Sequence, residues 1–143
     1  MKNLSRIFLR IGAIMAIICG VILLMVTIMF IIFSTPAFKD VLVESIKDGT
    51  SQTSFGGTPE HQADATQIMF IIMAVSFGLA GGVELASAII SFKAISNPSE
   101  NAFVLAIVFG SLSGTAFPIV GGIFGLIVDA KEKRKAEKLA INE

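Results

Sequence analysis

Charge is scarce in this sequence of 143 residues, of which only 15% are charged and 54% are hydrophobic. Soluble globular domains carry about 25% charged and about 45 to 50% apolar residues. The formal net charge is zero, and no basic run is interleaved with aromatic residues, so we expect no nucleic-acid partner. The shortage of charge predicts a single membrane domain over residues 1–143 in place of a water-soluble fold.

Residues that usually carry chemistry are also few. Cys19 is the single cysteine, so no internal disulfide is expected, and His61 is the single histidine. The chain contains no nucleophile paired with a base, no glycine-rich phosphate loop and no Cys and His spacing of a metal site. Glu60, His61 and Asp64 lie within one helical turn, where three ligands do not converge on one ion. We therefore predict no metal, no cofactor, no catalytic residue and no enzyme activity.

Long apolar runs are what the sequence has in abundance. The first uncharged run, 11–33, has 23 residues, and about 20 are enough to cross the apolar core of a bilayer. This predicts a spanning helix over 7–33. A signal peptide is the alternative, because a basic leader precedes the run and Thr35-Pro36-Ala37 is similar to a small-residue cleavage site. The run is, however, longer than the roughly 7 to 15 apolar residues of a signal core.

The next segment, 34–66, is polar and holds five acidic against two basic residues. That balance is typical of an exported loop. Thr35 as a cap, Pro36 in the first turn and Gly49 at the end predict a short amphipathic helix within it. The apolar residues of this helix recur at four-residue spacing and are Phe38, Leu42 and Ile46.

A second spanning helix is expected over 67–95, after Thr58-Pro59-Glu60 and before a polar turn. It carries one charge within its apolar run, at Glu84. An ionisable residue inside a span costs at least about 2.5 kcal/mol on insertion scales, which makes Glu84 a functional hypothesis.

Glu84 shares a helix face with small and hydroxyl-bearing residues, and the break in the third apolar run supplies further hydroxyl groups. The alternative is structural, with the carboxyl group satisfied by water or by a neighbouring hydroxyl. The face of Glu84 holds Phe77, Ala80, Gly81, Ser87, Ala88 and Ser91. The predicted ion, proton or partner site consists of Glu84, Ser87, Ser111, Ser113 and Thr115.

The third uncharged run, 102–128, has 27 residues, too few for two full crossings. With the amino end inside, a single crossing puts four Lys or Arg inside and seven outside, whereas a hairpin puts nine inside and two outside. Basic residues beside a span prefer the cytoplasm, and Gly and Pro interrupt this run. We therefore predict short helices over 100–112 and 115–130 and a basic cytoplasmic tail over 131–143. Three plain spans are the alternative.

The predicted fold is thus all-α, an integral membrane bundle of four helices made of two full spans and a short helical hairpin. Small residues recur every four positions and let helix backbones approach in lipid. A broken helix at membrane depth must also be shielded by its neighbours. The predicted helix-packing residues are Gly12, Ala16, Gly20, Ala74, Gly78, Gly82, Ala86, Gly110, Gly114 and Gly122, with Pro118 in the last ridge.

Short motifs follow the first span and occupy the last apolar run. They are Pro36-Ala37-Phe38 with Leu42, Phe117-Pro118-Ile119 and Gly121-Gly122-Ile123. Together with the basic leader and the charged end, they extend over nearly the whole chain, which resembles a family of small four-helix membrane proteins of unknown function from low-GC Gram-positive bacteria. The resemblance implies four helices with both termini in the cytoplasm, and it supplies no activity or site residues.

These patterns favour a small multi-pass protein of the cell membrane with a non-catalytic accessory, structural or partner-binding role. Its expected partners are the lipid bilayer and either further copies of itself or a larger membrane complex. Two alternatives stay open. One is an oligomeric transporter or channel that uses Glu84, since discontinuous helices often line sites at the midplane. The other is immunity or protection against a membrane-active peptide.

Overall fold

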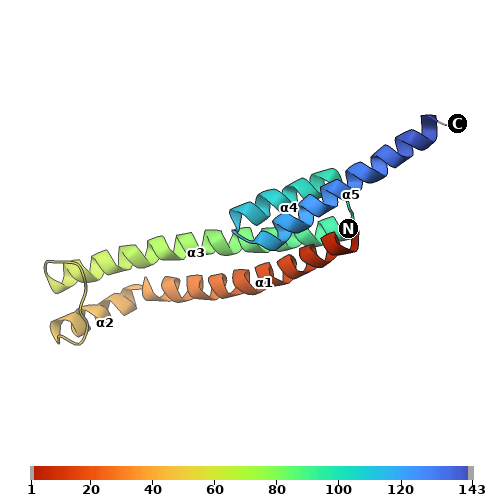
Figure 1. Cartoon of the computed structure of the whole chain (residues 1–143). Helices are drawn as coiled ribbons and strands as arrows, with labels where there is room; N and C mark the ends of the chain where they lie inside the picture. Colours follow the sequence, from red (N-terminus) through yellow and green to blue (C-terminus); the bar gives the residue numbers. More distant parts are fainter. Residues whose placement is uncertain (1, 142–143) are drawn as a thin grey trace. The chain divides into compact units, whose positions relative to one another are not determined.

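The computed structural model describes residues 2–141, and within this range the chain forms five helices and no strands (Figure 1). The helices are α1 (Lys2–Phe33), α2 (Pro36–Lys47), α3 (Pro59–Ser96), α4 (Glu100–Leu112) and α5 (Ala116–Ile141). The all-helical fold is confirmed. The count of four helices is wrong, because the short amphipathic helix of the polar loop is an ordered element that adds a fifth.

Helices α1 and α3 are long and apolar enough to cross a membrane. Only 11% of the most apolar stretch of α1 and 17% of that of α3 is buried within the chain. The core helix of a soluble protein is mostly buried, so this exposure distinguishes both helices from such an element. Both helices also begin earlier than predicted, at Lys2 and Pro59 and not at residues 7 and 67. A helical backbone continues through polar residues that hydropathy does not mark.

The beginning of α3 illustrates the role of local chemistry. Pro59 occupies the first helical position, where its fixed φ suits a helix and its missing N–H needs no partner. The hydroxyl of Thr58 accepts a hydrogen bond from the backbone N–H of His61 at 3.3 Å. Thr58 therefore caps α3, and α3 begins in the polar loop, ahead of the apolar run.

Contacts divide the chain into two compact units. Unit 1 consists of Met1–Val21 and Gly81–Glu143, and unit 2 consists of Ile22–Ala80. Helices α1 and α3 contribute residues to both units, whereas α4 and α5 belong to unit 1 and α2 belongs to unit 2.

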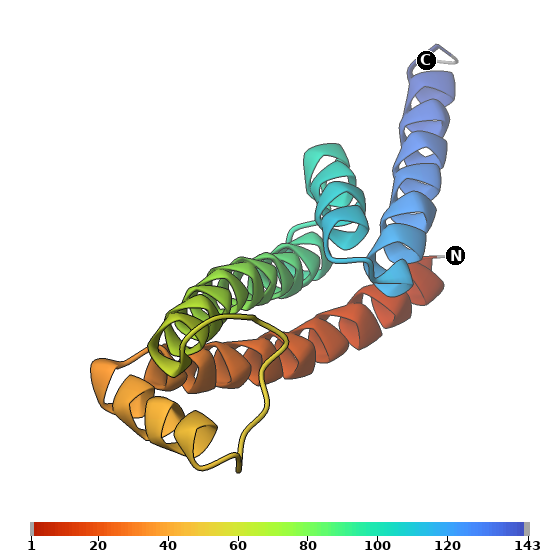
Figure 2. The ribbon, with the colours of Figure 1, turned by 90° about the vertical axis from the view of Figure 1, so that its left-hand side faces the viewer.

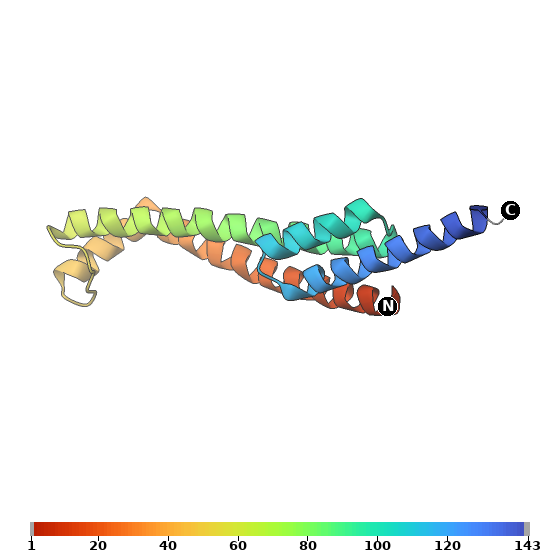
Figure 3. The same cartoon turned by 45° about the horizontal axis from the view of Figure 1, so that its top comes forward.

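In unit 1, the apolar run 102–128 is divided between two helices. Helices α4 and α5 lie side by side and antiparallel (Figures 1 and 3). The side chain of Ser99 caps α4 by accepting a hydrogen bond from the N–H of Ala102 at 3.3 Å. At the other end, Gly114 takes a φ of +70°, and the N–H of Thr115 donates to the carbonyl of Gly110 at 2.9 Å. A left-handed residue with this bond is a common helix ending, so the turn is encoded locally.

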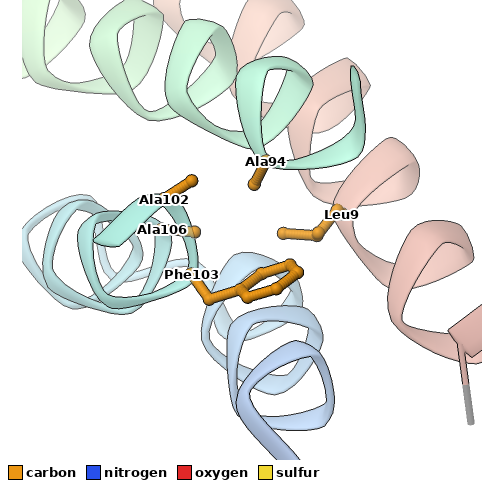
Figure 4. Packing of buried hydrophobic residues seen from close by; sticks show 5 residues of the cluster. All are labelled: Leu9, Ala94, Ala102, Phe103 and Ala106. Carbon is orange, nitrogen blue, oxygen red and sulfur yellow. The ribbon is translucent and has the colours of Figure 1, made fainter. Parts of the chain in front are cut away.

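The core of unit 1 is made mainly of small side chains and one aromatic ring. Figure 4 shows the ring of Phe103 from α4 beside Leu9 of α1 and Ala94 of α3, with Ala102 and Ala106 completing the cluster. A second cluster joins α1 and α3 and consists of Ala13, Ala16 and Ala88. Alanine at these positions lets the helix axes approach closely.

Several predicted packing glycines lie at close helix contacts in unit 1. A Cβ atom added to Gly12 would lie 2.7 Å from the Cδ of Pro118, which is itself fully buried. A Cβ at Gly122 would lie 2.8 Å from the carbonyl oxygen of Phe103. A Cβ added to Gly20 would crowd Leu85, and one added to Gly110 would crowd Pro118 and Ile119. Ala16 is fully buried.

Gly82 and Gly114 do not pack against another helix within residues 2–141, since a Cβ built on either one has no atom of a neighbouring element within 4 Å. Gly114 belongs to the turn. Gly82 lies on the exposed side of α3 because residues four apart advance by more than one turn of about 3.6 residues. The predicted ridge therefore rotates around the helix. Ala74 is buried and Ala86 is half-buried, and a Cβ added to Gly78 would meet Thr27 at an ordinary 3.4 Å.

In unit 2, a group of phenylalanine rings joins the ends of α1 and α3 to α2. The ring of Phe33 lies 4.8 Å from that of Phe38 in α2 and 5.7 Å from that of Phe70 in α3. The ring of Phe30 stacks on that of Phe77 at 5.7 Å. Aromatic pairs of this kind add about 0.5 to 1.5 kcal/mol beyond their buried area, and they give the apolar face of α2 its contact.

The N-terminus of α2 differs in detail from the prediction. Thr35 stands at the capping position and Pro36 follows it, but the Thr35 hydroxyl makes no cap. It donates instead to the carbonyl of Ile32 at 2.7 Å, at the end of α1. Gln67 of α3 donates to the carbonyl of Thr35 at 2.8 Å. Figure 2 shows α2 and the loop by which the chain returns to α3.

Candidate functional site

Three polar side chains of α3 are buried in unit 1, and we call Glu84, Ser87 and Ser91 the α3 polar stripe. Glu84 is 7% exposed, and both serines are fully buried. The Glu84 Oε2 atom and the two Oγ atoms have no hydrogen-bond partner within the described residues. Because an unpaired buried polar group costs about 1 to 3 kcal/mol, three of them on one face require an explanation.

Three other helical serines bond to the backbone of their own helix. The hydroxyls of Ser76, Ser96 and Ser111 each donate to the carbonyl four residues earlier, at 2.8, 3.1 and 2.8 Å. This is the usual solution for a helical serine in an apolar environment. Ser87 and Ser91 do not adopt it, so their hydroxyl groups are free to bind another group.

The carboxyl group of Glu84 also lacks a countercharge. The apolar runs 11–33 and 102–128, which supply the helices packed around α3 in unit 1, contain no charged residue. Within α3 itself, the nearest basic residue is Lys93, nine positions further on and exposed. An ionised carboxylate in such surroundings needs a proton or a cation from elsewhere.

The predicted site is brought together only in part. Glu84 and Ser87 lie on the same buried face, and Ser91, seven positions after Glu84, extends it. The hydroxyls of Ser113 and Thr115 bond to each other at 2.7 Å in the turn between α4 and α5, and Ser111 bonds within α4. These three hydroxyls are therefore used locally and are not hydrogen-bond partners of Glu84 Oε2.

One helical turn after Ser91, Ala94 lines a cavity of about 80 Å³ in unit 1. Two of the residues that line it, Lys2 and Glu132, form an ion pair at 3.0 Å. Its charged lining residues are Lys2, Arg6, Asp129 and Glu132. The α3 polar stripe thus leads along its helix toward a hollow that contains ionisable groups.

An ion-pair network joins the start of α4 to α5 in unit 1. The Nζ of Lys133 lies 2.8 Å from a carboxylate oxygen of Glu100 and 2.9 Å from one of Asp129. The hydrogen bond to Glu100, followed by that to Asp129, raises the pKa of Lys133 above its ordinary value. Lys133 therefore remains charged at any physiological pH.

In unit 2, two further ion pairs connect α2 to the first turns of α3. Lys39 pairs with Asp64, and Lys47 lies 2.9 Å from Glu60. The hydrogen bond from Lys47 is the main cause that lowers the pKa of Glu60. Both carboxylates beside His61 are thus occupied by lysines, and no group of three or more His, Cys, Asp and Glu in residues 2–141 is placed to hold a metal ion.

The Lys47 and Glu60 pair gives a pH-dependent prediction for α2. Because folding lowers the pKa of Glu60, the pair stabilises α2 above the ordinary value of 4.5 and loses this effect as the pH falls through the lowered value. At neutral pH, Glu60→Gln should therefore accelerate hydrogen exchange of the α2 amides, and acidification should reduce the difference from the unmodified chain. Glu44→Gln is the control, since Glu44 is exposed on α2 and forms no ion pair within residues 2–141.

Comparison with known proteins gives no match: no family model, no curated protein and no solved structure is similar to this chain at a significant level. The resemblance to four-helix membrane proteins of low-GC Gram-positive bacteria stays a prediction.

Proposed function

We propose that this chain is a small multi-pass membrane protein with a non-catalytic, partner-binding or structural role, and with both termini in the cytoplasm. One observation carries the proposal, namely the amount of apolar side chain that α1 and α3 leave uncovered. Leu79 and Ile89 of α3 are 69% and 68% exposed, and Met25 of α1 is 63% exposed. Water contact with such surfaces costs about 25 cal/mol per Å².

The exposed residues continue along both long helices. On α1 they include Ile14, Ile18, Ile22, Met25, Ile28 and Ile32, and on α3 they include Ile68, Ile72, Val75, Leu79 and Ile89. Soluble monomers rarely expose contiguous apolar patches beyond a few hundred Å². Lipid acyl chains, or the apolar helices of a partner within the bilayer, supply the missing cover.

The length of α4 and the short apolar part of α5 support the return of the chain to the cytoplasmic side, because the uncharged part of α5 covers only residues 116–128 of its 26 residues. Helix α4 has 13 residues, which corresponds to about 20 Å at about 1.5 Å per residue. A bilayer core of about 30 Å is longer than this. A pair of such helices that enters and leaves on one side also places nine of the eleven Lys and Arg residues in the cytoplasm.

Paired reporters test this topology. We expect a fusion after residue 143 to be active with a cytoplasmic reporter and silent with an exported one, and a fusion within 50–56 to give the reverse. The protein should also stay in the membrane fraction after an alkaline carbonate wash. Release by the wash would contradict a membrane location, whereas an exported reporter signal after residue 143 would contradict the returning pair α4 and α5.

The uncovered faces of the helices support the accessory role, because another membrane protein could pack against them. Their uncovered side chains are mainly apolar. A role in binding predicts that the protein elutes from a membrane-protein extract in a complex larger than one copy. We expect cross-linking through Cys19, the single cysteine, to distinguish a homo-oligomer, which gives a covalent dimer, from a complex with other chains.

A further inference from the structure

We propose that the α3 polar stripe is a binding site for a small monovalent cation, a proton or Na⁺, with Glu84 as its charged ligand and Ser87 as its second oxygen ligand. The inference rests on the proposed membrane location, because only lipid keeps water from the surrounding helices. A cation at this site would make the stability of the protein depend on that ion, which a purely structural role does not predict.

Burial decides the size of the occupant. Ser87 and Ser91 are fully buried and Glu84 is 7% exposed, so neither a second polypeptide nor a lipid headgroup can reach these atoms. Only a proton, a bare ion or a water molecule fits between packed helices. The unsatisfied Oε2 and Oγ atoms then have the partners that the protein itself does not supply.

Donor chemistry decides the class of ion. The unpartnered atoms are one carboxylate oxygen and two hydroxyl oxygens. Oxygen ligands suit protons and hard cations, and thiolate or imidazole ligands, which transition metals prefer, are not among them. One carboxylate provides one negative charge, which a monovalent cation neutralises and a divalent cation would leave in excess.

The surroundings contain no competing titratable group close to Glu84. In α1, the uncharged run from Ile11 onward contributes only Cys19, and α4 has no titratable residue after Glu100. Helix α5 has none before Asp129, and α3 has none between Asp64 and Glu84. The cation that binds at the stripe is therefore coupled to Glu84 alone.

Ser91 extends the polar stripe along α3 toward the cavity that Ala94 lines. Glu84, Ser87 and Ser91 follow one another at three and four positions, and Ala94 comes three positions later, so all four lie along one side of α3. The cavity that Ala94 lines contains Asp129 and Glu132. Both carboxylates are already paired, with Lys133 and Lys2, so the cavity supplies a polar surface beside the stripe and no second cation site.

The test measures thermal unfolding of the full chain, purified from membranes, with Na⁺ replaced by choline at constant ionic strength and at mildly alkaline and mildly acidic pH. If the occupant is Na⁺, its addition raises the Tm of the unmodified chain at alkaline pH, and Glu84→Gln removes this response. If the occupant is a proton, acidification raises the Tm without any effect of Na⁺, and Glu84→Gln removes the part of the response that belongs to Glu84.

Ser87→Ala keeps the proposal testable even if Glu84→Gln does not fold. It should shift the half-saturating cation concentration by about tenfold, which corresponds to the loss of about one ligand interaction. Ser76→Ala is the matched control, because Ser76 is an exposed serine of α3 that bonds to its own helix. The proposal is overturned if the unmodified chain and Glu84→Gln respond equally to Na⁺ and pH, or if Ser87→Ala behaves as Ser76→Ala does. Release of the protein from membranes before purification would contradict the proposed function instead.

Discussion

Leu79→Arg is expected to abolish stable membrane insertion of α3, whereas Leu139→Arg is expected to have no effect. The two leucines are 69% and 70% exposed, so neither substitution disturbs the packing of the chain itself. Leu79 lies near the middle of α3, where an arginine costs about 2.5 to 3.5 kcal/mol on insertion scales. Leu139 lies beyond the apolar part of α5, among charged residues.

The measurement is the fraction of each variant that resists carbonate extraction, together with reporter activity in the loop after α2. We expect Leu79→Arg to lower both values strongly and Leu139→Arg to match the unmodified chain. Equal behaviour of the two variants would mean that the exposed side of α3 faces water or a polar partner, and it would remove the main argument for a spanning helix.

Gly125→Ala is expected to lower the free energy of unfolding by about 1 to 3 kcal/mol, the usual cost of overpacking by one methyl group or slightly more. A Cβ atom at Gly125 would overlap the ring of Phe103, with its Cγ atom only 2.7 Å away. The ring belongs to the central cluster of unit 1, where Leu9 and Ala94 restrict its movement. Unfolding in mixed micelles of increasing denaturing detergent measures the change.

Gly82→Ala serves as the control for this prediction. No atom of another helix in the described part of the chain lies within 4 Å of a Cβ at Gly82, so alanine there should leave stability unchanged or raise it by up to about 1 kcal/mol through helix propensity. Replacement of Phe103 by leucine in the Gly125→Ala background should restore part of the loss. If Gly125→Ala and Gly82→Ala are equally stable, the close contact of α4 with α5 is wrong.

Much of the helical pattern follows from the sequence, because apolar runs and turn residues act locally. Pro36 and Gly49 mark the two ends of the α2 region, and Gly114 with Pro118 indicates the separation of α4 from α5. The residues that pack against a neighbouring helix are harder to predict from the sequence. A four-residue repeat of small residues drifts around a helix with about 3.6 residues per turn, so it included Gly82 and missed Gly125.

The candidate site was predicted in part for a similar reason. Helical periodicity places Glu84, Ser87 and Ser91 on one face, and this face is buried in the structure. Periodicity does not show whether a hydroxyl group bonds to its own backbone or points to a neighbour. Ser111 takes the local bond and Ser87 does not, and that choice depends on tertiary contacts that no single helix reveals.

Pro118 has a consequence for the backbone of α5 as well as for its packing against Gly12. Helix α5 begins at Ala116, in the middle of an uncharged stretch, and the first four N–H groups of any helix lack partners within the helix. In lipid, each such group costs several kcal/mol because no water is present to accept its hydrogen. Proline at the third position has no N–H to satisfy. A helix such as α5 can therefore begin within an apolar layer with one fewer hydrogen-bond donor left unpaired.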